Sequence, residues 1–226
     1  MPIYSEESPK RVMLANPGKF LPMTIGKNIL NVAYKKLGIE VQFIDLPAKR
    51  SLIESNQGKY DGEASRIWTI TNYFPNLVRV PTPINYIEQS LYATKEHDIS
   101  SCEQLKNYSV GIRRGVKHAE ECSAYTRRVV VFNDSNQMMK VLNAGRIDFV
   151  INARLHGLPF ENNDDFPNIL LIQPPLKRIN LYHCLHKSNA ILLDRIDEVL
   201  RLMAESGELE AIRKQTIQDY TAENRK

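Results

Sequence analysis

The pattern Asn-x-Gly-(Lys/Arg)-x-Asp occurs twice in this chain, over residues 56–61 and 143–148. Each copy ends a segment with helical apolar spacing and precedes a short apolar run. Glycine is favoured just after a helix because it adopts a left-handed conformation without a Cβ clash. The aspartate then opens the next strand. A chain that makes the same helix-to-strand connection twice is expected to contain two units of similar α/β design.

The segments around both copies alternate between strand and helix. In the first half, the patterns predict strands over 11–16, 39–46 and 60–67 and helices over 24–38 and 47–58. In the second half, they predict strands over 108–115, 127–133 and 146–152 and helices over 116–125 and 134–145. Such an alternation with short connections favours parallel sheets covered by helices. We expect two lobes, with one continuous α/β sheet as the alternative.

The remaining segments are less regular. Residues 77–84 contain two prolines and indicate an extended connector or edge strand. Residues 86–95 read as a strand and 101–107 as a short helix. Residues 167–176 and 179–187 are predicted as two strands, followed by two helices that are broken at Gly207.

Composition excludes several classes of protein. The net charge is +4 over 226 residues, and the basic residues are scattered, which argues against a nucleic-acid partner. No apolar run approaches the roughly 18 residues that a membrane span needs. The first residues show no signal peptide. The three cysteines, Cys102, Cys122 and Cys184, allow either one disulfide with a free thiol or three reduced thiols.

No enzyme or metal motif stands out. The chain has no GxSxG, HExxH, P-loop or GxGxxG pattern. His183 and His186 flank Cys184, but on a strand their odd separation turns them to opposite faces, so we interpret them as strand packing. His118 and His156 are isolated and read as ordinary histidines. We therefore predict no catalytic residue, no cofactor and no metal.

A basic turn in the second half is a candidate anion site. The strand over 108–115 leads into a helix start that carries Arg113, Arg114, Gly115 and Lys117. Arginine can grip a carboxylate or phosphate with two hydrogen bonds. The alternative is a solvated turn whose charges pair with Glu120 and Glu121 of the following helix.

A second group of candidates follows the strand at 60–67. Arg66 offers a charged clamp, and Trp68, the only tryptophan, offers a stacking face. The alternative is that Arg66 pairs with Glu63 while Trp68 fills the core. The other candidates for ligand contact, at strand ends, at a helix start and near a crossover, are Asn152, Arg154, Arg50 and Tyr86.

Four stretches in order resemble one protein family across nearly the whole chain. They are "LGIEVQFIDLPAKRSLIESNQGKYDGEASRI", "YSVGIRRGVKHAEE", "VLNAGRIDFVI" and "LLDRIDEVLRLMAESGELEAIRKQ". The set is similar to type II periplasmic solute-binding proteins, the polar amino-acid-binding family (bacterial extracellular solute-binding proteins, family 3). The resemblance implies a two-lobed α/β fold with a ligand cleft, with lobe 1 formed by residues 1–87 plus 184–226 and lobe 2 by residues 88–183.

The resemblance also implies a function. It implies non-catalytic binding of a small solute by lobe closure, with hinges near residues 86–91 and 178–184 and delivery to an ABC importer permease. It implies a periplasmic or other extracytoplasmic location, with the signal peptide missing from this sequence, and we expect a monomer. The alternatives are a ligand-sensing domain of a signalling receptor and a dehydratase-like enzyme on the same scaffold, which would need an acid or base such as Glu63 or His118.

Two departures from the family pattern bear on the ligand. Tyr73 stands where such proteins usually carry the arginine for the ligand's α-carboxylate, and Ala153 stands where an aspartate usually takes the ammonium. Arg66 could replace the carboxylate clamp, but no acidic group for an ammonium is evident. We therefore expect a polar or anionic solute in place of a standard zwitterionic amino acid.

Overall fold

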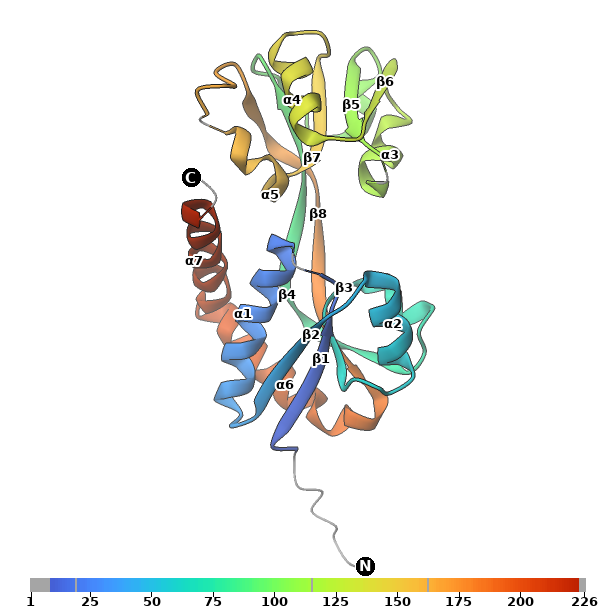
Figure 1. Ribbon diagram of the computed structural model, residues 1–226, viewed down its shortest axis with the longest axis vertical. Coiled ribbons are helices and arrows are strands. Elements are labelled where there is room, and N and C mark those ends of the chain that lie inside the picture. Colours follow the sequence, from blue (N-terminus) through green and yellow to red (C-terminus); the bar gives the residue numbers. More distant parts are fainter. Residues whose placement is uncertain (1–8, 19, 115, 162, 224–226) are drawn as a thin grey trace, which may run out of the picture. The chain divides into compact units, whose positions relative to one another are not determined.

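The computed structural model describes residues 9–18, 20–114, 116–161 and 163–223, without the side chain of Lys117 (Figure 1). It is a mixed α/β protein, as predicted. Two compact units divide the chain: unit 1 comprises Met1–Tyr86 and Asn180–Lys226, and unit 2 comprises Ile87–Ile179. Both boundaries differ slightly from the predicted lobes: Ile87, assigned to lobe 1, belongs to unit 2, and residues 180–183, assigned to lobe 2, belong to unit 1.

The sheet of unit 1 centres on β1 (Arg11–Asn16), which pairs in parallel with β2 (Glu40–Asp45) and β3 (Gly62–Ile67). The last part of β8 (Leu170–His186) pairs antiparallel with β3. Strand β3 is followed by a 3-10 turn, η1 (Trp68–Asn72). All three parallel strands therefore end at the same edge of the sheet.

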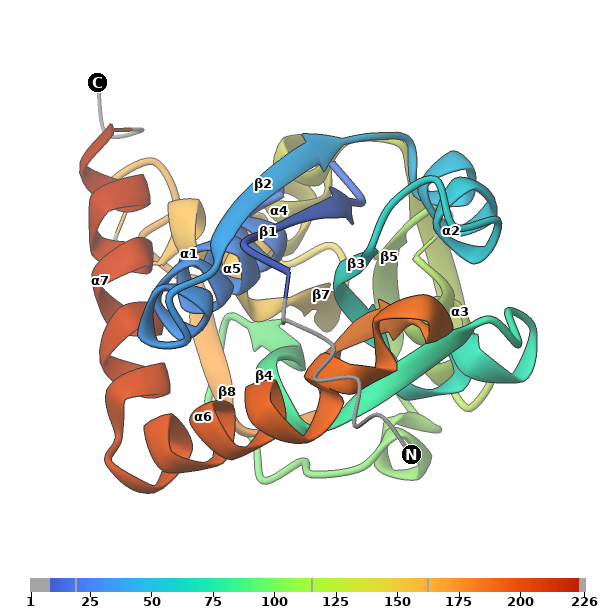
Figure 2. The ribbon, with the colours of Figure 1, turned by 90° about the horizontal axis from the view of Figure 1, so that it is seen from below.

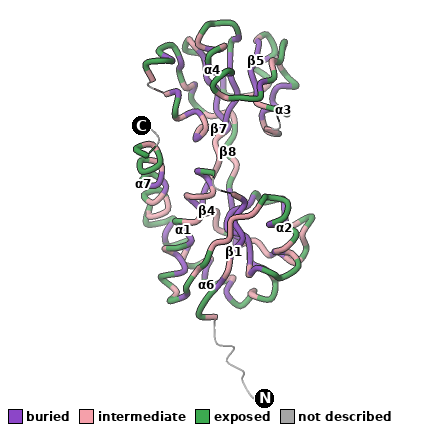
Figure 3. The backbone as a smooth tube through the Cα atoms, viewed as in Figure 1, coloured by how far each residue is buried: buried purple, intermediate pink, exposed green. Residues whose placement is uncertain are grey.

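Helices cover both faces of this sheet. The helices of unit 1 are α1 (Leu21–Lys36), α2 (Ala48–Asn56), α6 (Leu193–Glu205) and α7 (Glu208–Glu223), with η4 (Lys187–Leu192) before α6. Figures 1 and 2 place α1 and α7 side by side and α2 on the other side of β1 and β3. Figure 3 shows burial running along β1, while α1 and α7 alternate between buried and exposed residues. Leu14, Ile25 and Ile29 lie in this core.

Unit 2 repeats the plan with β5 (Ser109–Arg113), β6 (Arg128–Phe132) and β7 (Phe149–Ala153). Strand β5 pairs in parallel with both β6 and β7, and β4 (Leu77–Ala93) pairs antiparallel with β7. The shorter elements are α3 (Lys117–Ser123), α4 (Ser135–Asn143), α5 (Arg154–Gly157), η2 (Cys102–Leu105) and η3 (Leu158–Phe160). A disulfide joins Cys102 to Cys122, and Cys184 is free and buried.

The repeated sequence pattern has the same structural role in both units. Gly58 and Gly145 follow α2 and α4 in the left-handed region, with φ of 80° and 66°. The carboxylate of Asp61 accepts a 2.7 Å hydrogen bond from the backbone N–H of Met13 on β1. The carboxylate of Asp148 accepts the matching 2.7 Å bond from the N–H of Ser109 on β5. Each aspartate thus ties the strand that follows it to the neighbouring parallel strand, β1 in unit 1 and β5 in unit 2.

Two strands differ from prediction. The two strands expected over 167–187 form the single strand β8, and residues 77–95, predicted as a connector and a strand, form β4 through Ala93. Over all strands the order is β2-β1-β3-β8-β4-β7-β5-β6. Strand β4 pairs with β7 only over Gln89–Tyr92. Pro81 and Pro83 lie outside this ladder, so their missing N–H groups remove no hydrogen bond from it.

Candidate functional site

The carboxyl ends of β1 and β2 form a polar cluster in unit 1. Asn16 and Asp45 end these strands as register partners. The side-chain N–H of Asn16 donates to an oxygen of Asp45 at 2.7 Å and to the carbonyl oxygen of Gly18 at 2.6 Å. A hollow of about 370 Å³ opens beside them, lined by Pro17, Gly18, Phe20, Asp45, Leu46, Pro47 and Ala48.

An acidic and an aromatic group meet at this hollow. The Phe20 side chain is 62% exposed, and the Asp45 carboxylate lies 3.6 Å from the ammonium group of Lys27. Asp45 is an acidic group that the sequence pattern did not indicate for an ammonium, and Asn16 and Phe20 were not among the predicted site residues either. The signal was present: the last residues of parallel strands share one edge of a sheet, where ligands of α/β folds bind.

Arg66 is engaged inside unit 1. Its Nε donates to Glu63 at 2.7 Å, and its Nη2 donates to the carbonyl oxygen of Ala48 at 3.1 Å. Glu63 is fully buried and also accepts hydrogen bonds from the hydroxyls of Ser51 and Ser55 at 2.6 and 2.8 Å. The Arg66–Glu63 pair, one of the two sequence interpretations, is therefore present. Since Ala48 also lines the hollow, Arg66 lies at its border with its charge neutralised.

Trp68 does not fill the core, because its side chain is 53% exposed. The guanidinium of Arg79 stacks on the Trp68 ring and lies 4.9 Å from the ring centroid of Tyr182. The Nε and Nη1 atoms of Arg79 are buried without a hydrogen-bond partner among the described residues. Arg79 thus covers one face of the Trp68 ring, and ligand contact by Trp68 stays a prediction.

The other candidates in unit 1 have partners within the unit. Arg50 is exposed and donates to Glu54 at 2.6 Å. The hydroxyl of Tyr86 donates to Glu210 at 3.3 Å, and the guanidinium of Arg213 lies 3.8 Å from the centroid of its ring. Arg50 thus pairs within α2, and Tyr86 packs against α7. Ligand contact by Arg50 and Tyr86 stays a prediction.

In unit 2, three parallel strands bring the remaining candidates to one edge. Arg114 donates from Nε to the side-chain oxygen of Asn133 at 3.0 Å, and Arg154 pairs with Glu161 at 3.2 Å. Gly115 and the side chain of Lys117 lie outside the described residues. The guanidinium of Arg113, in contrast, forms no hydrogen bond or ion pair with any residue that the structure describes; only the backbone of Arg113 is hydrogen-bonded.

Two histidines and an amide lie near Arg113. Burial lowers the pKa of His156, and the positive charge of Arg113 lowers it further. Burial also lowers the pKa of His118, with a second contribution from His156. The side-chain nitrogen of Asn152 and the Nε2 atom of His118 are buried without a hydrogen-bond partner in the described part of the chain. Both histidines are therefore neutral near pH 7.

The segment around Cys184 is a packing feature of unit 1. The Nδ1 of His183 lies 2.8 Å from the carbonyl oxygen of Glu63, so it is the donor, and Nε2 accepts from the Tyr34 hydroxyl at 2.7 Å. Burial lowers the pKa of His183 to about 4 and raises the pKa of the Cys184 thiol to about 12. His186 bonds to Ser188 instead. Within the described ranges, no three His, Cys, Asp or Glu side chains gather as a metal site would require.

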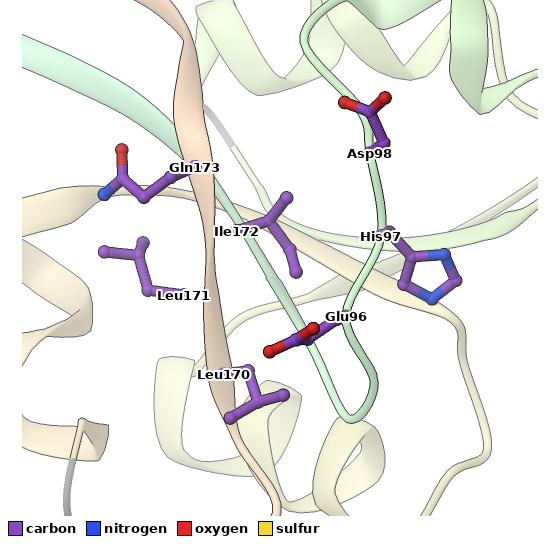
Figure 4. Close-up of a pocket in the computed structure, with 7 residues that line it drawn as sticks. All are labelled: Glu96, His97, Asp98, Leu170, Leu171, Ile172 and Gln173. Carbon is purple, nitrogen blue, oxygen red and sulfur yellow. The ribbon is translucent and has the colours of Figure 1, made fainter.

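A second hollow, of about 550 Å³, lies in unit 2, away from Arg113 (Figure 4). It is lined by Glu96, His97, Asp98, Leu170, Leu171, Ile172 and Gln173. Residues 96–98 follow β4 at the amino end of β7, because Tyr92 pairs with Val150. His97 turns away from β8 and packs on Phe149. No candidate residue lines this hollow, and it lies at the edge of the sheet opposite Arg113.

Comparisons with known proteins agree on one fold. A family model described as bacterial extracellular solute-binding proteins, family 3, matches residues 26–219. A Bacillus subtilis protein of known structure is 19% identical, with a TM-score of 0.75 over 92% of this chain and 90% of that chain. The L-cystine solute receptor of Neisseria gonorrhoeae, in an unliganded open conformation, is 15% identical, with a TM-score of 0.73 over 92% of both chains.

A signalling protein shares the fold as well. A histidine kinase sensor domain with similarity to periplasmic binding proteins is 16% identical, with a TM-score of 0.62 over 93% of this chain and 97% of that chain. The comparison with curated proteins gives no match. Across the described ranges, none of the helices combines the length and apolarity needed to cross a membrane. The family match spans most of the sequence, and the chain belongs to the bacterial extracellular solute-binding proteins, family 3.

Proposed function

We propose that this protein binds a small polar or anionic solute outside the cytoplasm without converting it. The observation that carries the proposal is that polar side chains lie at the carboxyl ends of parallel strands in both units, within a chain that belongs to a solute-binding family. They are Asn16 and Asp45 in unit 1 and Arg113 and Asn152 in unit 2. In α/β folds ligands bind beyond these strand ends. Unit 1 supplies the hollow with Phe20 and Asp45, and unit 2 supplies the partly buried Arg113.

The proposed compartment and partner follow from the family and from the disulfide. Disulfides persist in oxidising compartments, so the Cys102–Cys122 bond supports a periplasmic or other extracytoplasmic location. The partner in this proposal is an ABC importer permease that receives the solute, and closure of the two units on the solute would signal the loaded state. The likeness to a kinase sensor domain supports a second role, as the sensing domain of a receptor.

Mass spectrometry of the solute that co-purifies with the protein tests the proposal. The identified compound should raise the melting temperature of solute-free protein, because it binds the folded state only. Asp45→Asn and Arg113→Gln should each reduce this shift, whereas Arg201→Gln, a charge change on an exposed face of α6, should leave it intact. Prolonged incubation should return the compound unchanged.

The outcomes are separable. Loss of the compound with appearance of a product would establish an enzyme and refute passive binding. Full stabilisation of both the Asp45 and the Arg113 variants would place the solute elsewhere.

A further inference from the structure

Several buried polar groups without a described partner lie at the carboxyl edge of the unit 2 sheet. Strands β5 and β7 are parallel, with Ile112 paired to Ile151. The next residues along the two strands are Arg113 and Asn152, which therefore lie side by side on the same face. Asn152 is 2% exposed, and its side-chain nitrogen finds no acceptor among the described residues.

Three further polar groups lie at or beside the same edge. The Nε2 of His118, at the start of α3, is buried and unpaired in the described part of the protein. His156, on α5, lies close enough to Arg113 and to His118 for their charges to affect one another. Ser90, which pairs with Asn152 across β4 and β7, also has a buried hydroxyl without a described partner. Buried polar groups rarely stay unpaired in folded proteins, so a missing partner is expected.

The nature of the missing partner follows from charge. Arg113 carries a full positive charge, and all the unpaired nitrogens named can act as hydrogen-bond donors. A cation would be repelled, and a neutral group would leave the guanidinium uncompensated. An oxyanion offers several acceptor lone pairs and the opposite charge.

We propose that Arg113, His118, Asn152 and His156 form an oxyanion subsite in unit 2 that holds the carboxylate or other acidic group of the solute. This inference rests on the proposed solute-binding function and specifies which part of the solute unit 2 recognises. It also replaces Arg66, whose charge Glu63 neutralises, as the main anion contact.

The subsite has a second property, which is coupling to protons. Without an anion, both histidines are held neutral by burial and by positive neighbours. His118 faces His156 and Lys177, which disfavour its charged form, and Glu121, which favours it; His156 faces Arg113. A bound anion reverses this balance, so binding takes up protons. The affinity for the anion then increases as the pH falls, by up to about tenfold per pH unit for each proton taken up.

Inorganic sulfate provides a probe that needs no knowledge of the solute and stays doubly charged across the pH range. Long-range proton–nitrogen NMR spectra would follow the histidine rings during a pH titration, in sodium sulfate and in sodium chloride of equal ionic strength. Sulfate should raise the pKa of both His118 and His156 by about one unit. The titration of His183, in the core of unit 1, serves as the internal reference.

A matched pair of variants makes the result specific. In Arg113→Gln the response to sulfate should disappear, and the pKa of His156 in chloride should rise because a repelling charge is gone. Arg128→Gln makes the same charge change at the opposite edge of the same sheet, because Arg128 pairs with Ser109, and should respond like the wild type. An unchanged titration in sulfate, or a shift that persists in Arg113→Gln, would overturn the subsite.

The two proposals can fail separately. If the co-purifying solute binds while the histidines ignore sulfate, the solute-binding function stands and the subsite is wrong. If sulfate moves both histidines in an Arg113-dependent way but no small molecule stabilises the protein, the subsite stands and the proposed function is wrong.

Discussion

The pair formed by Arg66 and Glu63 decides whether Arg66 serves stability or ligand binding. Both side chains are buried, at 9% and 0% exposure, and they meet at 2.7 Å. Removal of one member of a buried ion pair leaves the other charge without a partner and typically costs about 3–5 kcal/mol. Because Ser51 and Ser55 still donate to Glu63, we expect Arg66→Met to cost about 3 kcal/mol, at the low end of this range.

The double variant separates the pair from its surroundings. Glu63→Gln should also cost about 3 kcal/mol, because Arg66 keeps only the Ala48 carbonyl as a described acceptor. In Glu63→Gln/Arg66→Met neither charge remains, so the combined loss should be smaller than the sum by about 3 kcal/mol. The exposed pair of Arg201 and Glu198 has the same spacing in sequence and should show a coupling of only about 0.5 kcal/mol.

Urea unfolding followed by tryptophan fluorescence measures these losses in the appropriate unit, because the only tryptophan, Trp68, belongs to unit 1. Strictly additive losses for the buried pair would refute the reasoning. A loss below about 1 kcal/mol for Arg66→Met would do the same. In either case Arg66 would be available to a ligand, as the sequence interpretation supposed.

Three further predictions concern stability. Burial holds the pKa of His183 near 4, so between about pH 6.5 and 4 the unfolded state binds a proton that the folded state does not. The free energy of unfolding, measured with urea, should therefore fall by about 3 kcal/mol as the pH is lowered through this window. His183→Gln should abolish most of this pH dependence. A Cβ on Gly157 would lie 1.9 Å from the Tyr92 hydroxyl, so Gly157→Ala should cost about 2 kcal/mol in thermal unfolding; an unchanged melting temperature would contradict the packing. Loss of the Cys102–Cys122 disulfide, by serine substitution, should destabilise unit 2 by about 3 kcal/mol in circular dichroism melts, while equal stability with and without the bond would contradict the prediction.

Local chemistry made much of the fold predictable. The ends of α2 and α4 followed from Gly58 and Gly145, because glycine adopts the left-handed conformation that ends a helix without a Cβ clash. Gly207 separates α6 from α7 as expected. The start of α1 was placed too late, because Pro22 suits the first turn of a helix but reads as a loop signal in sequence. The break expected between residues 176 and 179 is absent, because β8 runs continuously from Leu170 to His186.

The site was harder to predict, for a geometric reason. The sequence left two roles open for Arg66, a ligand clamp or a pair with Glu63, because residues three apart on a regular strand point to opposite faces. A register shift between them in the β3–β8 ladder brings both to the same face. Nothing in the local sequence announces this irregularity. Asn16 and Asp45 depended on knowing which strands are neighbours, and Arg113 was distinguished from Arg114 only by the contact that Arg114 makes with Asn133.

The division of the chain has a consequence for its synthesis. Unit 2 is one uninterrupted segment, Ile87–Ile179, whereas unit 1 needs residues from both ends of the chain. On the ribosome, unit 2 is complete while Tyr34 of unit 1 still lacks His183, and α1 still lacks α7. Until the last helix is synthesised, unit 1 cannot fold completely, and its apolar surface stays exposed. At that stage the nascent chain is expected to bind chaperones.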